Sequence, residues 1–135
     1  MIAQLTGTVV DASQPGAVVL DVRGVGYELG VSRTTAADLP APGTPGVTLL
    51  TRLRVSENAV ALFGFSTREE RAVFDRLVQI PKVGPALALK ILSSFTHRQL
   101  AEAVACQDVG RMTAAPGAGP KPAPRPLPDP APAPP

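Results

Sequence analysis

The chain has 135 residues, of which 44% are apolar and 18% are charged, with a net charge of +2 and a pI of about 9.1. A single cysteine, Cys106, excludes an internal disulfide and any metal site built from several cysteines. No apolar run approaches the length of about 18 residues that a membrane-spanning helix needs, and no secretory signal pattern is present. The sequence therefore predicts a cytoplasmic protein without membrane contact.

Residues 2–65 predict five short β-strands that are rich in valine and leucine and are separated by turn-forming residues. The predicted strands are IAQLTGTVV, AVVLDV, GVGYELGV, VTLLTRLRV and AVALFGF. Five strands in so short a segment suit a small closed barrel of the oligonucleotide/oligosaccharide-binding (OB) type. Between the third and fourth strands, TTAADLPAPGTPG predicts one helical turn that its prolines end.

The apolar period changes to that of a helix after residue 65. Ser66 with Glu69, and later Thr96 with Gln99, form capping-box patterns, and Pro85 suits the first position of the helix between them. Residues 66–121 therefore predict a small all-α domain, with Cys106 buried on an apolar helix face. The fold class is α+β: an all-β barrel domain over residues 1–65, then the helical domain.

The C-terminal segment has a different composition. Ten of the sixteen prolines lie between Pro116 and Pro135, so residues 122–135 predict a disordered, Pro/Ala-rich tail.

One candidate binding motif is the stretch IPKVGPALALKIL, which starts at Ile80. Gly84 would let a ligand approach the backbone, and the free N–H groups at the start of the next helix would bind a phosphate without reading bases. The same stretch also fits an ordinary tight turn between two helices. The candidate DNA-binding residues here are Lys82, Val83, Gly84, Pro85, Ala86 and Lys90.

A second loop of the same kind begins at Pro116, with the sequence PGAGPK. Its candidate DNA-binding residues are Gly117, Ala118, Gly119 and Lys121. Prolines at every second position from Pro122 to Pro128 prevent a helix after this loop, because each interior proline costs about 3 kcal/mol. The domain is therefore predicted to lack its last helix.

The sequence offers no catalytic constellation and no cofactor or metal motif. His97 is the only histidine and is expected to be a solvated surface residue. No phosphate-binding loop of an ATPase is present, so the chain is not expected to be an enzyme by itself.

Taken together, MIAQLTGTV, GVGYEL, VSENAVALFGF, REERAVFDRLVQIPKVGPALALKIL and DVGRMTAAPGAGPK resemble the RuvA family of Holliday-junction-binding subunits, in order over residues 1–121. The resemblance implies a homotetramer that holds a four-way DNA junction open, with acidic residues of the barrel at its centre and two helix–hairpin–helix loops on the duplex arms. It also implies a third domain that binds the RuvB ATPase, which uses ATP and Mg²⁺, and the RuvC resolvase as a further partner. That third domain is expected to be absent here.

Carried over by position, the central acidic pin falls on Glu57 and Asn58, so one of the family's usual negative charges is missing. The first loop usually has a glycine where this chain has Lys82 and a basic residue where it has Ala86. The second loop matches, but the proline run replaces its helix. These departures predict an impaired junction-binding subunit in DNA recombination and repair.

Two other functions remain open from the sequence. The chain could be a truncated product that only oligomerises, as an inactive partner of complete subunits. A base-excision glycosylase is a third reading, with Asp108 or Glu102 as the acid, but no aromatic side chain is available there to stack a flipped base.

Overall fold

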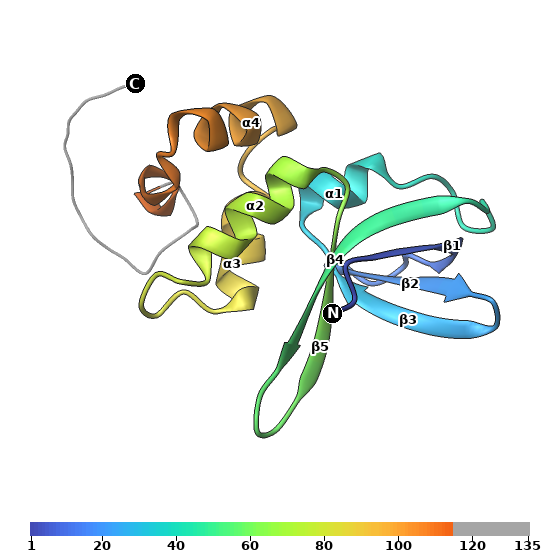
Figure 1. Cartoon of the computed structure of the whole chain (residues 1–135). Coiled ribbons are helices and arrows are strands. Elements are labelled where there is room, and N and C mark those ends of the chain that lie inside the picture. Colours follow the sequence, from blue (N-terminus) through green and yellow to red (C-terminus); the bar gives the residue numbers. More distant parts are fainter. Residues whose placement is uncertain (115–135) are drawn as a thin grey trace.

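The computed structural model describes residues 1–114 (Figure 1). The strands come first, as predicted: β1 Gln4–Asp11, β2 Ala17–Val22, β3 Val25–Gly30, β4 Val47–Val55 and β5 Val60–Phe65. The short helix α1 (Arg33–Asp38) lies between β3 and β4 in the chain. The helices α2 Arg68–Leu77, α3 Pro85–Leu92 and α4 His97–Cys106 follow, and a 3-10 turn, η1 Val109–Ala114, comes last. The predicted tail, residues 122–135, lies outside the described residues.

The five strands close into a barrel in the order β1-β2-β3-β5-β4, which confirms the predicted OB-type fold. All neighbours are antiparallel except β3 and β5, which are parallel and joined at one register pair, Gly30 and Phe63. Alternate residues of each strand face inward. The barrel core consists of Val9, Val18, Leu20, Leu29, Val31 and Leu49.

A second core lies between the barrel and the helices. Phe74 of α2 is buried against two rings of β5, with its centroid 5.4 Å from that of Phe63 and 4.9 Å from that of Phe65. The helices add Val73, Leu77, Ala88, Ile91, Leu92 and Leu100, and η1 adds Val109 and Met112. Because β5 contributes to this core, the barrel and the helices share one apolar contact surface.

The N-caps of α2 and α4 were both predicted from capping-box patterns. The prediction for α2 was wrong by one residue, and the prediction for α4 is confirmed. Thr67, not Ser66, caps α2, and its Oγ1 accepts from the N–H of Glu70 at 3.1 Å. Ser66 is engaged elsewhere, since its hydroxyl donates to the Asp38 carboxylate at 2.9 Å. The capping box of Thr96 with Gln99 at the start of α4 is present as predicted.

His97 is not the solvated surface residue that the sequence predicts. Its side chain is two-thirds buried, its Nε2 contacts the Asp38 carboxylate of α1, and it lies 3.4 Å from the Ser66 hydroxyl. The other ring nitrogen, Nδ1, is buried without a partner. This arrangement does not form a nucleophilic triad, because the carboxylate and the hydroxyl both meet the same ring nitrogen.

The contact with His97 lowers the pKa of Asp38 from its ordinary value of 3.8, and the Ser66 hydroxyl lowers it further. A carboxyl whose pKa is lower in the folded than in the unfolded chain stabilises the fold fully at a pH above its unfolded pKa. That stabilisation is lost as the pH falls through its folded pKa. The free energy of unfolding of Asp38→Asn is therefore expected to fall less than that of the parent chain as the pH is lowered. Urea unfolding between about pH 6 and pH 3 measures this. Glu69→Gln, which removes an exposed carboxyl, is the control, and an equal change in both variants would contradict the prediction.

Cys106 is exposed at the end of α4, so the prediction of a buried thiol was wrong. The helix ends directly after it, where Gln107 turns the chain with a left-handed φ of 54°. Among residues 1–114, no helix is long and apolar enough to cross a membrane.

Candidate nucleic-acid interface

The loop between α2 and α3 is a tight turn held by its own backbone. The N–H of Ile80 donates to Leu77 at 3.0 Å, and the N–H of Val83 donates to Ile80 at 3.0 Å. Gly84 is the N-cap of α3 and Pro85 is its first residue, as predicted. No side chain caps this helix, so its first N–H groups, which carry the positive end of the helix dipole, remain available to an anion.

Neither packing nor backbone geometry explains the glycine at position 84. Its φ of −87° and ψ of 177° are open to any residue, and a Cβ built there would meet no atom within 4 Å. Gly84 is exposed at the mouth of the loop. A ligand that approaches the backbone at this point would exclude a side chain, whereas the folded chain alone would not.

Lys82 lies where the resemblance implies a glycine. Its φ is +71°, in the left-handed region that side chains other than glycine seldom adopt. The loop therefore holds a lysine in a backbone conformation that favours glycine.

Lys82→Gly is expected to stabilise the chain by about 0.5–1 kcal/mol, because relief of the left-handed conformation outweighs the added freedom of the unfolded chain. Thermal or urea unfolding measures the difference. Lys82→Ala is the matched control, since it removes the charge and keeps the strained φ. If alanine stabilised the chain as much as glycine, backbone strain would not be the cause.

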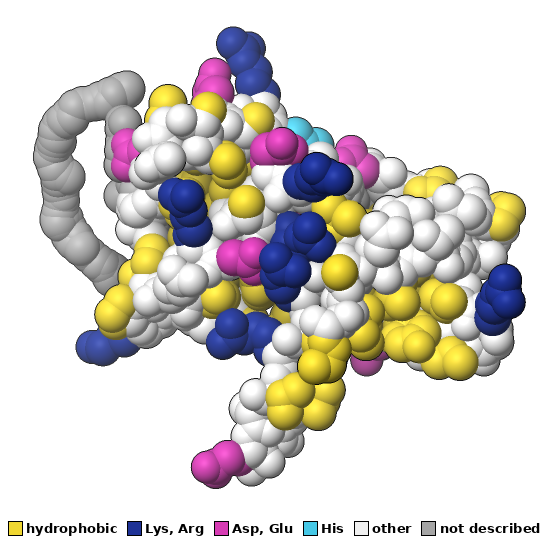
Figure 2. Space-filling view, viewed as in Figure 1, with side chains coloured by type: hydrophobic (Ala, Val, Ile, Leu, Met, Phe, Trp, Pro, Cys, Tyr) yellow, Lys and Arg dark blue, Asp and Glu magenta, His cyan; other side chains and the backbone are white. Residues whose placement is uncertain are grey.

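The hairpin of β4 and β5 carries the predicted acidic pin. Val55 pairs with Val60, the N–H of Ser56 donates to Ala59 at 2.8 Å, and Glu57 and Asn58 form the exposed tip. In Figure 1 the hairpin projects downward from the barrel, and the α2–α3 loop lies to its left in the view. Figure 2 shows basic side chains over the helices and around the hairpin's base, and an acidic side chain at its tip.

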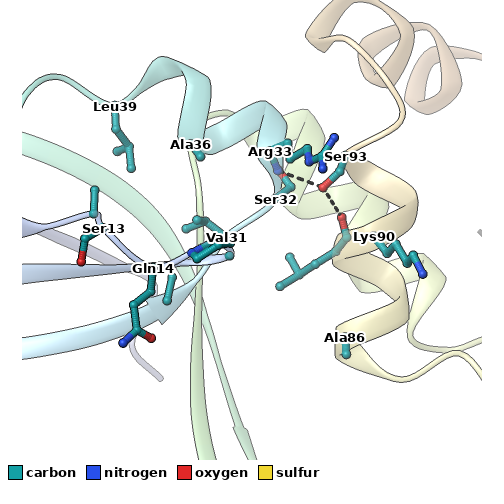
Figure 3. A pocket seen from close by; sticks show the side chains of 15 residues that line it. Ser13, Gln14, Val31, Ser32, Arg33, Ala36, Leu39, Ala86, Lys90 and Ser93 are labelled. Carbon is teal, nitrogen blue, oxygen red and sulfur yellow. Dashed lines mark hydrogen bonds between the residues drawn. The ribbon is translucent and has the colours of Figure 1, made fainter. Parts of the chain in front are cut away.

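Lys90 lies in the last turn of α3 and is exposed. Beside α3 there is a cleft of about 600 Å³, between the β1–β2 loop, α1 and α3, and Figure 3 shows the Lys90 side chain pointing away from it. The structure thus brings the predicted residues 82–86 into one exposed loop and places Lys90 further along α3, on the helix surface.

The second predicted loop, with Gly117, Ala118, Gly119 and Lys121, lies outside the described residues and stays a prediction. Among residues 1–114, no three histidine, cysteine, aspartate or glutamate side chains are grouped to hold a metal ion.

From the sequence, Glu69 is named at this helix start and the role of its neighbour Glu70 is not identified. Glu70 is fully buried and accepts hydrogen bonds from the hydroxyls of Ser32 and Thr35. The one signal available in the sequence was that two capping patterns overlap here. Thr67 with Glu70 has the same spacing as Ser66 with Glu69.

A closed OB-type barrel followed by helices with an exposed, uncapped glycine loop is an architecture that occurs among nucleic-acid-binding proteins. Residues 1–64 match the family of the RuvA N terminal domain, and residues 74–125 match the SAM-like helix-hairpin-helix tandem. The chain belongs to the RuvA family.

Curated relatives agree with these matches. The chain is 46% identical over 121 residues to a protein of Chromobacterium violaceum, 47% identical to one of Neisseria meningitidis serogroup C and 45% identical to one of Delftia acidovorans. Each is named Holliday junction branch migration complex subunit RuvA. The aligned region covers 90% of this chain and 60–63% of each relative, so the chain spans about 60% of the length of the relatives it matches.

Proposed function

We propose that the chain is a non-enzymatic DNA-binding subunit that recognises four-way junctions by their shape in DNA recombination and repair. The observation that carries this proposal is the exposed loop at Gly84, where an uncapped helix start is open to a phosphate and no side chain obstructs it. Contacts of this kind recognise the DNA backbone and not the base sequence. The second loop, at Gly117 and Lys121, would add contacts of the same type.

The acidic hairpin tip supports a role at a junction more than a role on plain duplex. Glu57 would repel phosphates and keep strands apart at a crossover, a function that needs several subunits around one point. We propose a homotetramer for this reason. In a branch migration complex, ATP hydrolysis with Mg²⁺ would belong to a RuvB partner, and RuvC would act on the same junction.

A second candidate function is oligomerisation without DNA binding. Val55 and Val60 support it, because their side chains form a pair at the hairpin's stem that is 70% and 69% exposed, as expected of a contact with another copy. Such a chain would enter complete tetramers as an inactive subunit.

Binding to a synthetic four-way junction and to linear duplex, each at two salt concentrations, tests the proposal. Preference for the junction would support it, and the slope of log K against log salt would count phosphate contacts, at about −0.9 for each. A chain that forms oligomers but binds neither DNA would favour the second candidate.

A further inference from the structure

Helix α1 and its N-cap residue Ser32 make polar contacts with α2, with the end of α3 and with α4. The Thr34 hydroxyl lies 3.1 Å from the carbonyl of Leu92 and 2.7 Å from that of Phe95, beside the end of α3. The N–H of Arg33 donates to the Ser93 hydroxyl at 2.9 Å, which Figure 3 shows from close by. Asp38 contacts His97 of α4, as described above, and Ser32 and Thr35 bind Glu70 of α2.

Glu70 is the most deeply buried of these groups. Its side chain is 0% exposed, and its two hydroxyl partners, Ser32 and Thr35, are 1% and 0% exposed. No ion pair among residues 1–114 includes Glu70. A buried acid whose hydrogen bonds come from two hydroxyls of one short helix is satisfied in a single arrangement, because any rotation of α2 against α1 leaves polar atoms unpaired.

The cleft of about 600 Å³ beside α1 limits the apolar packing at this place, so polar contacts contribute to the orientation of the helices. It separates the β1–β2 loop from α3, so on this side α3 meets the barrel mainly through Leu89, which lies beside Gly30 at the end of β3. The phenylalanine contacts of α2 hold the two parts together, but apolar contacts are not directional. The direction of the helices therefore depends on the polar contacts across this boundary. Besides those of α1, they are the ion pair of Arg52 in β4 with Asp75 in α2 at 2.8 Å and the hydrogen bond from the Arg71 side chain to the Ala3 carbonyl at 2.8 Å. Of the side chains in α2 that make such contacts, Glu70 is the one that is fully buried.

We propose that Glu70 is a positioning residue which, through Ser32 and Thr35, fixes the direction of the α2–α3 loop relative to the barrel. It thereby determines the preference for branched over linear DNA. This inference rests on the proposed function. A junction would meet both the α2–α3 loop and the β4–β5 tip of the same chain, whereas linear duplex would need the loop alone. Only junction binding would therefore depend on the direction of the loop relative to the tip.

Glu70→Met, which keeps the side-chain length and removes both acceptors, tests the inference. We expect it to lower the ratio of junction to duplex affinity about tenfold, while duplex affinity changes by less than about twofold. Glu70→Gln keeps one acceptor oxygen and should restore part of the ratio. Glu69→Met is the matched control, because Glu69 is the exposed neighbour of Glu70. This variant removes the same charge but none of the hydrogen bonds to Ser32 and Thr35. An unchanged ratio in Glu70→Met, or an equal loss of both affinities, would overturn the proposal.

A measurement without DNA separates this inference from the proposed function. Cys106 is an exposed label site on the helices, and Glu28→Cys adds one on strand β3 of the barrel. Spin labels at both sites, diluted with unlabelled chain, should give one narrow distance distribution, and Glu70→Met should broaden it. If Glu70→Met fails to fold, Thr35→Val, which removes one donor, replaces it. An unchanged distribution overturns the positioning role even if DNA binding changes, and a chain that binds neither DNA overturns the proposed function.

Discussion

Gly84→Asp is expected to abolish DNA binding while leaving the fold as stable as before or slightly more stable. Aspartate is a good N-cap residue and carries a charge that suits a helix start, so α3 should gain about 0.5 kcal/mol. The φ of −87° accepts a side chain, and the space around the Cβ is open. The carboxylate would lie where a phosphate is proposed to bind, and opposed like charges should reduce affinity on the order of 100-fold or more.

Titration of a labelled junction, together with thermal unfolding of the same samples, measures both effects. Gly84→Ser is the matched control, because serine caps the helix as well and adds no charge. We expect its affinity to fall about tenfold, since a side chain without charge only obstructs the close approach. If Gly84→Asp bound the junction as the parent chain does, the loop at Gly84 would not be a DNA contact.

Phe74→Ala should cause the largest loss of stability. Truncation of a buried phenylalanine costs about 3–5 kcal/mol, a large part of the roughly 5–15 kcal/mol by which a domain is stable. The Phe74 ring contacts Phe63 and Phe65 of the barrel, so the loss should lower the stability of the barrel and the helices together.

Urea unfolding followed by far-ultraviolet circular dichroism measures the loss, and backbone amide signals in β1 and α4 report the two parts separately. Phe74→Leu keeps most of the apolar volume and should cost about 1.5 kcal/mol or less. A barrel that unfolded at its original urea concentration while the helices melted would show that the two parts are independent, contrary to the shared core.

The elements of the fold could be predicted because each depends on a local pattern. Short segments rich in valine and leucine between turn-forming residues predict the strands, and Pro85 and the pair of Thr96 with Gln99 predict the helix starts. The cap of α2 could not be predicted, because two capping patterns overlap by one residue. The choice between Ser66 and Thr67 is decided by Asp38, which is far from both in the chain.

The sequence predicts the loop of the candidate site, but it does not predict the buried polar contacts that hold the helices against the barrel. The loop at Gly84 has a sequence signature, but the left-handed φ of Lys82 contradicts the usual preference of lysine. Glu70 has partners 38 and 35 residues away, and His97 has one 59 residues away. Distances of this size along the chain are fixed only when the barrel has closed, so no local pattern reveals them.

The position of α1 in the chain has a consequence for how the protein is made. Six residues are too few to form a helix alone in water, and a ribosome releases α1 before Glu70, Ser93 and His97 exist. Until these partners are synthesised, the Ser32 and Thr35 hydroxyls of the segment between β3 and β4 remain hydrogen-bonded to water. The barrel has a core of its own, made by residues that precede α2, but α1 meets its last partner only after α4 has left the ribosome. We therefore expect the contact between the barrel and the helices to form last.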